Sequence, residues 1–193
     1  MTHPPASPST DFQAEEQTVW QGKFITAKVR GRWEYVSRAR GIHAAVIVAV
    51  EAGAIILVEQ FRVPLGRPCI ELPAGLIGDH EGLEGEDTLE AANRELEEEA
   101  GYRAGRMEVL GEFYSSPGMV SESFTLLRAH DLTRVGPGGG TEGENITVHH
   151  VPLATLPAFI AERRARGDAI DVKLLLLLGP ALLGDTLNMG DAA

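Results

Sequence analysis

The chain has few of the residues that mark several common classes of protein. Cys69 is its only cysteine, so no internal disulfide can form. Its 17 Lys and Arg residues are outnumbered by 28 Asp and Glu, which gives a net charge of −11 and disfavours nonspecific binding to nucleic acid or anionic membrane. The leucine-rich stretch 174–183, interrupted by Gly179 and Pro180, is too short to span a bilayer. Residues 1–11 lack the apolar centre of a signal peptide. We therefore expect a cytoplasmic protein with neither nucleic acid nor membrane as a partner.

The residues that are present predict one α/β domain with extra strands at its N-terminus. Hydrophobic residues make up 44% of the 193 positions, enough to bury one core. Mixed strands and helices favour a sheet sandwiched between helices. Strands are predicted over 24–29, 32–38, 43–50, 54–61, 69–72, 107–114, 124–129 and 146–151, and helices over 88–100, 153–163 and 171–178. We divide the chain into a disordered tail (1–15), N-terminal strands (16–42), a main domain (43–183) and a flexible tail (184–193).

The predicted helix over 88–100 has clear signals at both ends. Asp87 is placed to cap it, with Glu90 at the position of a capping box. Gly101 is placed to end it in a left-handed conformation. A narrow apolar stripe recurs at helical spacing along it, formed by Leu89, Ala92, Leu96 and Ala100.

Three carboxylates lie beside this stripe at i, i+3 and i+4. A helix turns about 100° per residue, so Glu95, Glu98 and Glu99 share one side, which we expect at the rim of the core. Arg94 precedes Glu98 by four residues and is placed to pair with it. Such a cluster suits a hard cation such as Mg²⁺ or Mn²⁺. The alternative is an ordinary solvated face.

The same segment resembles the signature of the Nudix hydrolases. The right half of that signature reads Arg-Glu-aliphatic-any-Glu-Glu-any-Gly, and residues 94–101 match it. The family also has a Glu eight residues before this Arg, and Glu86 matches it. The left half departs from the pattern, because the family glycine should come six residues before that Glu, whereas the obvious glycine, Gly75, lies five residues farther away. The family's fold, an α/β/α sandwich around a mixed sheet, is implied for residues 43–183.

The flanking residues resemble the ADP-ribose pyrophosphatase branch of that family. The turn Ser116-Pro117-Gly118 comes sixteen residues after Gly101, as the branch marker does, although the tripeptide alone indicates only a turn. The segments 33–38, 58–62 and 70–75 are also similar to that branch.

The resemblance implies a role for residues on and around the helix. Glu95 and Glu99 are implied as metal ligands, with the backbone carbonyl of Ala74 beside them, for two or three Mg²⁺ ions or Mn²⁺. Glu98 is implied as an additional acid that Arg94 orients. Glu142, in a glycine-rich loop (136–144) that composition predicts to be mobile, is implied as the general base. Glu144 is the alternative base, and a plain solvated loop is the other interpretation.

The resemblance also implies substrate-binding positions. Trp33 and Arg38 match positions that hold adenine, and Phe24 matches an aromatic residue that stacks on it; ordinary packing is the alternative. Arg62 matches a phosphate or ribose contact, with an ion pair to Glu71 as the alternative. Pro117 and Glu122 are the remaining substrate-binding candidates.

The function so implied is metal-dependent hydrolysis of ADP-ribose to AMP and ribose 5-phosphate. A nucleoside diphosphate sugar is then the substrate, and a homodimer that exchanges N-terminal strands is the expected assembly. Two alternatives stay open: the same reaction on another nucleotide sugar such as GDP-mannose, and a non-catalytic ADP-ribose sensor.

Overall fold

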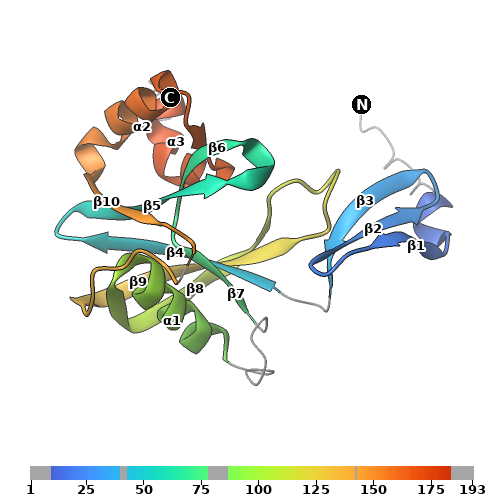
Figure 1. Ribbon diagram of the computed structural model, residues 1–193, viewed down its shortest axis with the longest axis horizontal. Coiled ribbons are helices and arrows are strands. Elements are labelled where there is room, and N and C mark those ends of the chain that lie inside the picture. Colours follow the sequence, from blue (N-terminus) through green and yellow to red (C-terminus); the bar gives the residue numbers. More distant parts are fainter. Residues whose placement is uncertain (1–9, 40–42, 78–86, 142, 184–193) are drawn as a thin grey trace, which may run out of the picture.

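The computed structural model describes residues 10–39, 43–77, 87–141 and 143–183 of the chain (Figure 1). The strands are β1 Glu16–Gln21, β2 Ile25–Arg30, β3 Trp33–Arg38, β4 His43–Glu51, β5 Ala54–Arg62, β6 Arg67–Glu71, β7 Ala74–Ile77, β8 Tyr102–Tyr114, β9 Ser123–Arg134, β10 Thr147–Pro152 and β11 Ala169–Ile170. The α-helices are α1 Thr88–Ala100, α2 Leu156–Ala165 and α3 Leu175–Leu183, and short 3₁₀ helices lie at Thr10–Gln13, Val63–Leu65, Leu153–Thr155 and Val172–Leu174.

The main sheet is buried on both faces because its central strands are apolar at successive positions. Alternate side chains of a strand point to opposite faces. Val46 of β4 therefore packs in one core and Ile47 in the other, and Leu57 and Ile56 of β5 divide in the same way. Helices α2 and α3 cover the first face and α1 covers the second (Figure 1). This arrangement confirms the predicted α/β/α sandwich.

The sheet is mixed, as predicted. Its strand order is β11-β6-β5-β4-β9-β8, with β10 also paired to β5 and β7 to β4. Strand β4 runs parallel to β9, with 44–49 opposite 124–129, and antiparallel to β7. The start of β7 thus comes next to α1, where the carboxylates lie.

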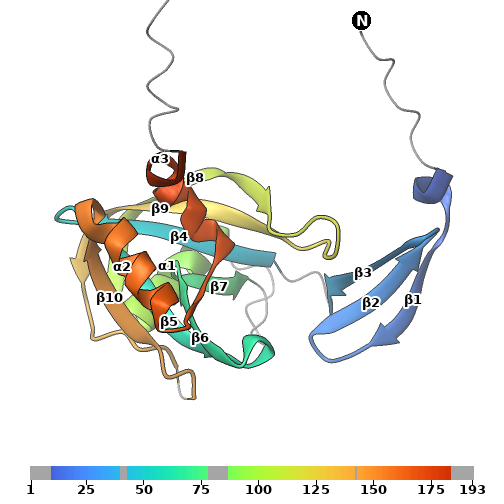
Figure 2. The same ribbon diagram turned by 90° about the horizontal axis from the view of Figure 1, so that it is seen from above.

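The N-terminal strands β1, β2 and β3 form a separate antiparallel sheet that projects from the main body (Figure 2). It joins the body through the turn before β9. Val36 donates its N–H to the carbonyl of Met119 at 3.0 Å, and its carbonyl accepts from the N–H of Ser121 at 3.0 Å. Large hydrophobic side chains stay exposed on this small sheet and its turns: Val19, Trp20, Phe24, Ile25 and Trp33.

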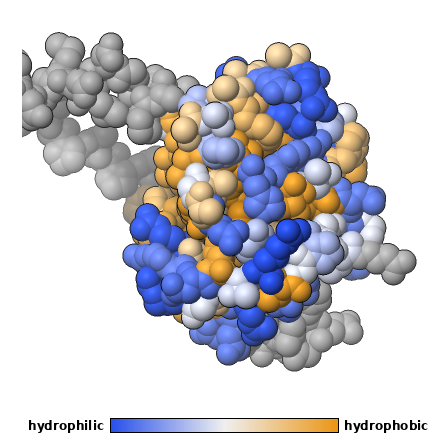
Figure 3. All heavy atoms as spheres, turned by 90° about the vertical axis from the view of Figure 1, so that its left-hand side faces the viewer, coloured by the Kyte–Doolittle hydropathy of each residue, from blue (hydrophilic) through white to orange (hydrophobic). Residues whose placement is uncertain are grey.

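The surface of the main body that lies at the left of Figure 1, away from the small sheet, carries hydrophobic and hydrophilic side chains side by side (Figure 3). No helix in the described ranges is both long and apolar enough to cross a bilayer.

Some predicted boundaries were wrong. Residues 1–15 were predicted as a disordered tail; 1–9 lie outside the described residues, whereas Thr10–Gln13 forms a 3₁₀ helix, with Asp11 ion-paired to Arg32 at 2.9 Å. Strands β1, β7 and β11 were missed, and β8 begins five residues before the predicted start. These strands are short or polar, so their pairing depends on neighbours that a local pattern does not reveal. The predicted tail 184–193 lies outside the described residues.

Candidate active site

Helix α1 begins and ends as predicted, and this fixes the direction of its side chains. Oδ1 of Asp87 accepts from the N–H of Leu89 at 2.8 Å and caps the first turn. Gly101 ends the helix at φ 76°, in the left-handed region that favours glycine. Because Ala92 and Leu96 are fully buried, the helix cannot rotate about its axis without exposing them.

This orientation brings the carboxylates to the rim of the core, as predicted. Glu99 is 7% exposed, and the side chains of Glu95 and Glu98 are 14% and 34% exposed. The cluster is therefore not an ordinary solvated face, since burial of charged groups without compensation is unfavourable.

Glu99 is the buried member of the three. Its Oε2 accepts from the N–H of Ala74 at 2.9 Å, which ties α1 to the start of β7. Burial raises the pKa of the Glu99 carboxyl to about 8 against the opposing effect of that hydrogen bond. The neighbouring carboxylates Glu95 and Glu144 raise this pKa further, while Arg62 lowers it. A positive charge added at this site therefore stabilises the ionised carboxylate of Glu99.

Gly75 allows Glu95 to lie directly over β7. A Cβ atom on Gly75 would be 1.9 Å from Cγ of Glu95, a distance that no side chain can tolerate. The glycine is thus needed for the close approach of strand and helix. The predicted five-residue irregularity between Gly75 and Glu86 falls mostly on 78–86, outside the described residues.

Arg94 pairs with two of the carboxylates. Its Nη1 lies 2.9 Å from Oε1 of Glu95 and 3.4 Å from Oε2 of Glu98, and the second contact is the predicted i,i+4 pair. The guanidinium thus fixes the directions of both acids from one side of the helix.

The acids form one wall of a cavity of about 520 Å³ between α1, the main sheet and the turn before β9. Basic side chains line it as well, so the cavity presents both signs of charge. Its lining includes Arg38, Arg62, Glu71, Ala74, Gly75, Glu95, Glu98, Glu99, Ser115, Glu122, Thr141, Glu144 and Lys173.

Two arginines predicted to bind substrate are held by carboxylates at this cavity. Arg62 makes a two-point contact with buried Glu71, Nε to Oε1 at 2.6 Å and Nη2 to Oε2 at 2.9 Å. Arg38 pairs through Nε with Oε1 of Glu122. The ion pair that was the alternative interpretation of Arg62 therefore exists. It leaves the arginine at the cavity, with its pKa raised chiefly by the hydrogen bond to Glu71.

Sequence reasoning missed Lys173. The 3₁₀ helix Val172–Leu174 starts at the N-cap Asp171, and this turn aims Lys173 into the cavity. Its Nζ lies 2.6 Å from Oδ2 of Asp171 and 5.6 Å from the ring centre of Phe124. No local pattern marked it, because it comes from the far end of the chain.

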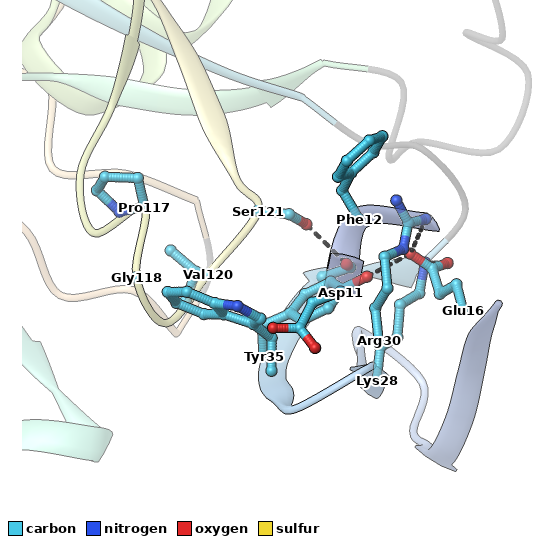
Figure 4. A pocket seen from close by; sticks show the side chains of 12 residues that line it. Asp11, Phe12, Glu16, Lys28, Arg30, Tyr35, Pro117, Gly118, Val120 and Ser121 are labelled. Atoms are coloured by element: carbon cyan, nitrogen blue, oxygen red, sulfur yellow. Dashed lines mark hydrogen bonds and ion pairs between the residues drawn. The ribbon is translucent and has the colours of Figure 1, made fainter. Parts of the chain in front are cut away.

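The predicted adenine-binding residues do not meet within one chain. Strand β3 directs Trp33 and Tyr35 to a second cavity of about 650 Å³, whereas Arg38 lines the first. Pro117, Gly118 and Val120 form the opposite wall of the second cavity (Figure 4). Phe24 is exposed with Nζ of Lys23 5.0 Å from its ring centre, and it is not among the described residues that line either cavity.

The donor set fits a divalent cation. A buried carboxyl with a raised pKa beside two other acids has the chemistry that Mg²⁺ or Mn²⁺ would stabilise. Within the described part of the chain, no three His, Cys, Asp or Glu side chains are close enough to hold a metal by themselves. The candidate base Glu142 and the acid Glu86 both lie outside the described residues.

Comparison with known proteins agrees with the geometry. The Nudix domain model matches residues 39–170. The chain is 40% identical over 89 residues to an ADP-ribose pyrophosphatase of Bacillus subtilis, covering 46% of this chain and 45% of that protein. It is 34% identical over 158 residues to a GDP-mannose pyrophosphatase of Cronobacter sakazakii, covering 78% and 77%.

A solved structure described as an ADP compounds hydrolase superposes with a TM-score of 0.65 at 25% identity, covering 89% of this chain and 94% of that one. The match to the Bacillus protein spans less than half of its length. The family model, by contrast, matches most of this chain and includes the carboxylate helix, β7 and most of the residues that line the cavity, while Arg38 and Lys173 lie just outside the matched range. The predicted family is confirmed: the chain belongs to the Nudix family.

Proposed function

We propose that this protein hydrolyses the pyrophosphate bond of ADP-ribose and releases AMP and ribose 5-phosphate. The observation that carries the proposal is the cavity itself, where the perturbed carboxyl of Glu99 faces the basic groups of Arg62 and Lys173. A pyrophosphate bound between them meets cations on one side, and the acids attract metal on the other.

Glu95, Glu99 and the carbonyl of Ala74 would hold Mg²⁺, two or three ions per site, with Mn²⁺ as a substitute. Glu144 adds a nearby negative charge, as its effect on the pKa of Glu99 indicates. When bound, the metal neutralises charge on the phosphates and makes a bound water more acidic.

The basic residues orient the substrate. Arg38 and Arg62 are each fixed by a carboxylate, Glu122 and Glu71, so little side-chain entropy is lost when they contact phosphate or ribose oxygens. Lys173 contributes a third positive charge to the same cavity. Glu142 takes the proton of the attacking water, and Glu144 is the alternative acceptor.

The adenine site is proposed to require a second chain. Trp33 and Arg38 line different cavities of one chain, and the small sheet that carries Trp33 exposes several large hydrophobic side chains. A homodimer in which these sheets exchange would cover that surface and complete a site from Phe24, Trp33, Arg38 and Pro117.

GDP-mannose is the second candidate substrate. The relative described as a GDP-mannose pyrophosphatase aligns over 78% of this chain, a longer match than that to the Bacillus protein. A sensor without catalytic activity is disfavoured, because Glu95, Glu98 and Glu99 would serve no purpose in it.

A panel of nucleotide sugars tests the proposal. Purified protein with Mg²⁺ is given ADP-ribose, GDP-mannose and other nucleoside diphosphate sugars, and phosphate is measured after phosphatase treatment. We expect the highest kcat/KM with ADP-ribose, and a loss of several orders of magnitude in Glu99→Gln. A higher kcat/KM with GDP-mannose would identify GDP-mannose as the substrate instead. Inactivity on the whole panel would favour the non-catalytic sensor.

A further inference from the structure

The glycine-rich loop that sequence composition predicts to be mobile lies against the carboxyl end of α1. The last carbonyls of a helix have no partner within it. The N–H groups of Gly139 and Gly140 donate to the carbonyls of Glu99 and Glu98 at 2.9 and 3.0 Å. Two backbone carbonyls of the acid cluster are therefore satisfied by the loop and not by water.

The contact is too close for any side chain. Gly138 has φ 70°, and a Cβ atom there would lie 2.6 Å from the carbonyl carbon of Ala100 and 2.7 Å from the carbonyl oxygen of Glu99. On the helix side, a Cβ on Gly101 would lie 2.3 Å from the carbonyl oxygen of Gly136. Loop and helix thus touch backbone to backbone.

The same loop carries Glu144 and holds its carboxylate in place. The N–H and hydroxyl of Thr141 both donate to Oε2 of Glu144, at 2.6 and 3.0 Å. A Cβ on Gly140 would lie 2.6 Å from that oxygen, so the carboxylate of Glu144 packs directly against the backbone of Gly140. The N–H of buried Ile146 donates to the carbonyl of Gly139 at 3.1 Å and closes the loop.

From this geometry we propose that residues 138–140, the glycine segment, position Glu144 relative to Glu99. Gly138 acts through Glu144 and contacts no substrate, so it is a positioning residue. The acid of the loop then keeps a fixed distance from the acids of α1, because its loop is bonded to the same helical turn. This inference rests on the proposed metal-dependent function, since it concerns how the acids share a cation.

Mn²⁺ affinity tests the inference directly. Free Mn²⁺ is measured by electron paramagnetic resonance in the presence of the full chain without substrate. Supporting groups around a metal site typically change affinity about 10- to 100-fold, and we expect Gly138→Ala to raise the Mn²⁺ Kd at least about tenfold. The matched control is Gly53→Ala, which has a similar φ of 78° in open space on the β4–β5 turn. The Mn²⁺ Kd of Gly53→Ala should stay within about threefold of the wild-type value, because this substitution adds backbone strain far from the acids.

A double-mutant cycle separates positioning from damage to α1. If Gly138 acts through Glu144, then Gly138→Ala should weaken Mn²⁺ binding less than about twofold in a Glu144→Gln background. A full tenfold loss in that background, or none in the wild-type background, overturns the inference. Should Gly138→Ala fail to fold, Thr141→Val replaces it. We expect at least about threefold weaker binding, since one hydrogen bond to Glu144 is lost, and unchanged affinity overturns the inference.

The wild type distinguishes this inference from the function on which it rests. If the wild-type chain binds no Mn²⁺, the proposed function fails and the positioning role fails with it. If the wild type binds Mn²⁺ and hydrolyses nucleotide sugars while the variants keep its affinity, only the positioning role fails.

Discussion

Replacing Glu99 by glutamine should stabilise the metal-free protein while abolishing its response to metal. The folded state holds this carboxyl at a pKa of about 8, whereas an ordinary glutamate carboxyl has a pKa of 4.5. A raised pKa means that the folded state binds the proton more tightly than the unfolded state. Stability is therefore full below pH 4.5 and falls as pH rises towards 8.

The magnitude follows from the shift. At pH 7 the unfolded chain ionises this carboxyl freely while the fold largely keeps it protonated, so at 1.36 kcal/mol per unit the shift lowers the stability of the metal-free fold by on the order of 3 kcal/mol. Glutamine is neutral at every pH and keeps an oxygen for the N–H of Ala74, but its amide N–H₂ group needs a partner, which offsets roughly 1 kcal/mol. We expect a net gain of about 1–2 kcal/mol, or a rise in Tm of roughly 2–8 °C for a domain of this size.

Thermal unfolding in EDTA at pH 5, 7 and 8, and again with Mg²⁺, checks this prediction. The gain should be absent at pH 5 and grow towards pH 8, and Mg²⁺ should raise Tm in the wild type only. Glu97→Gln is the control, because Glu97 is on the same helix but is exposed, pairing with Arg103 at 3.4 Å. Its Tm should hardly change. A Glu99→Gln protein that is less stable than wild type at pH 8 without metal would refute the reasoning.

Three further predictions concern other parts of the chain. Arg163 is 5% exposed and ion-paired to Glu59 and Asp168, so Arg163→Met should cost about 3–5 kcal/mol of unfolding free energy by chemical denaturation at pH 7. Burial raises the pKa of Glu59, but hydrogen bonds and charges from His149 and Arg163 outweigh burial, so the pKa is lowered. A lowered carboxyl pKa stabilises the fold above the ordinary pKa, and this stabilisation is lost on acidification. The loss of unfolding free energy in Arg163→Met should therefore be smaller at pH 4. Burial raises the pKa of the Cys69 thiol to about 12, so iodoacetamide at pH 8 should alkylate the native protein at least ~100-fold more slowly than the urea-unfolded chain, by mass spectrometry. Glu142→Ala should lower kcat with little change in Mn²⁺ affinity; if Glu144→Ala alone shows that pattern, Glu144 is the base.

The carboxylate helix was predictable because its signals are local. Asp87, the apolar stripe and Gly101 lie within fifteen consecutive residues, so capping and periodicity fix both the ends and the buried side of α1. The positions of Glu95, Glu98 and Glu99 at the core rim follow from that side alone. The strands β4 and β5 were predictable for the same reason, because each is a local run of consecutive apolar residues.

The rest of the site was not predictable, because it depends on contacts between distant segments. Lys173 reaches the cavity from near the end of the chain, and Trp33 is separated from Arg38 by the pleat of one strand. The loop 136–144 has the composition of a mobile linker, yet its glycines allow a backbone contact with α1 that no pattern in the loop indicates. Composition reports the conformational freedom of a segment and says nothing of its neighbours.

The alternation of β3 between two cavities limits which mutations the N-terminal region can accept. Side chains of one strand line two cavities, so an insertion or deletion of one residue between Trp33 and Arg38 would place both side chains on the same face and turn one of them away from its cavity. Substitutions change one surface at a time, whereas length changes alter both together. Homologues are therefore expected to vary β3 in sequence but keep its length, and grafting a new specificity onto this protein should replace alternate residues of β3, never the strand as a block.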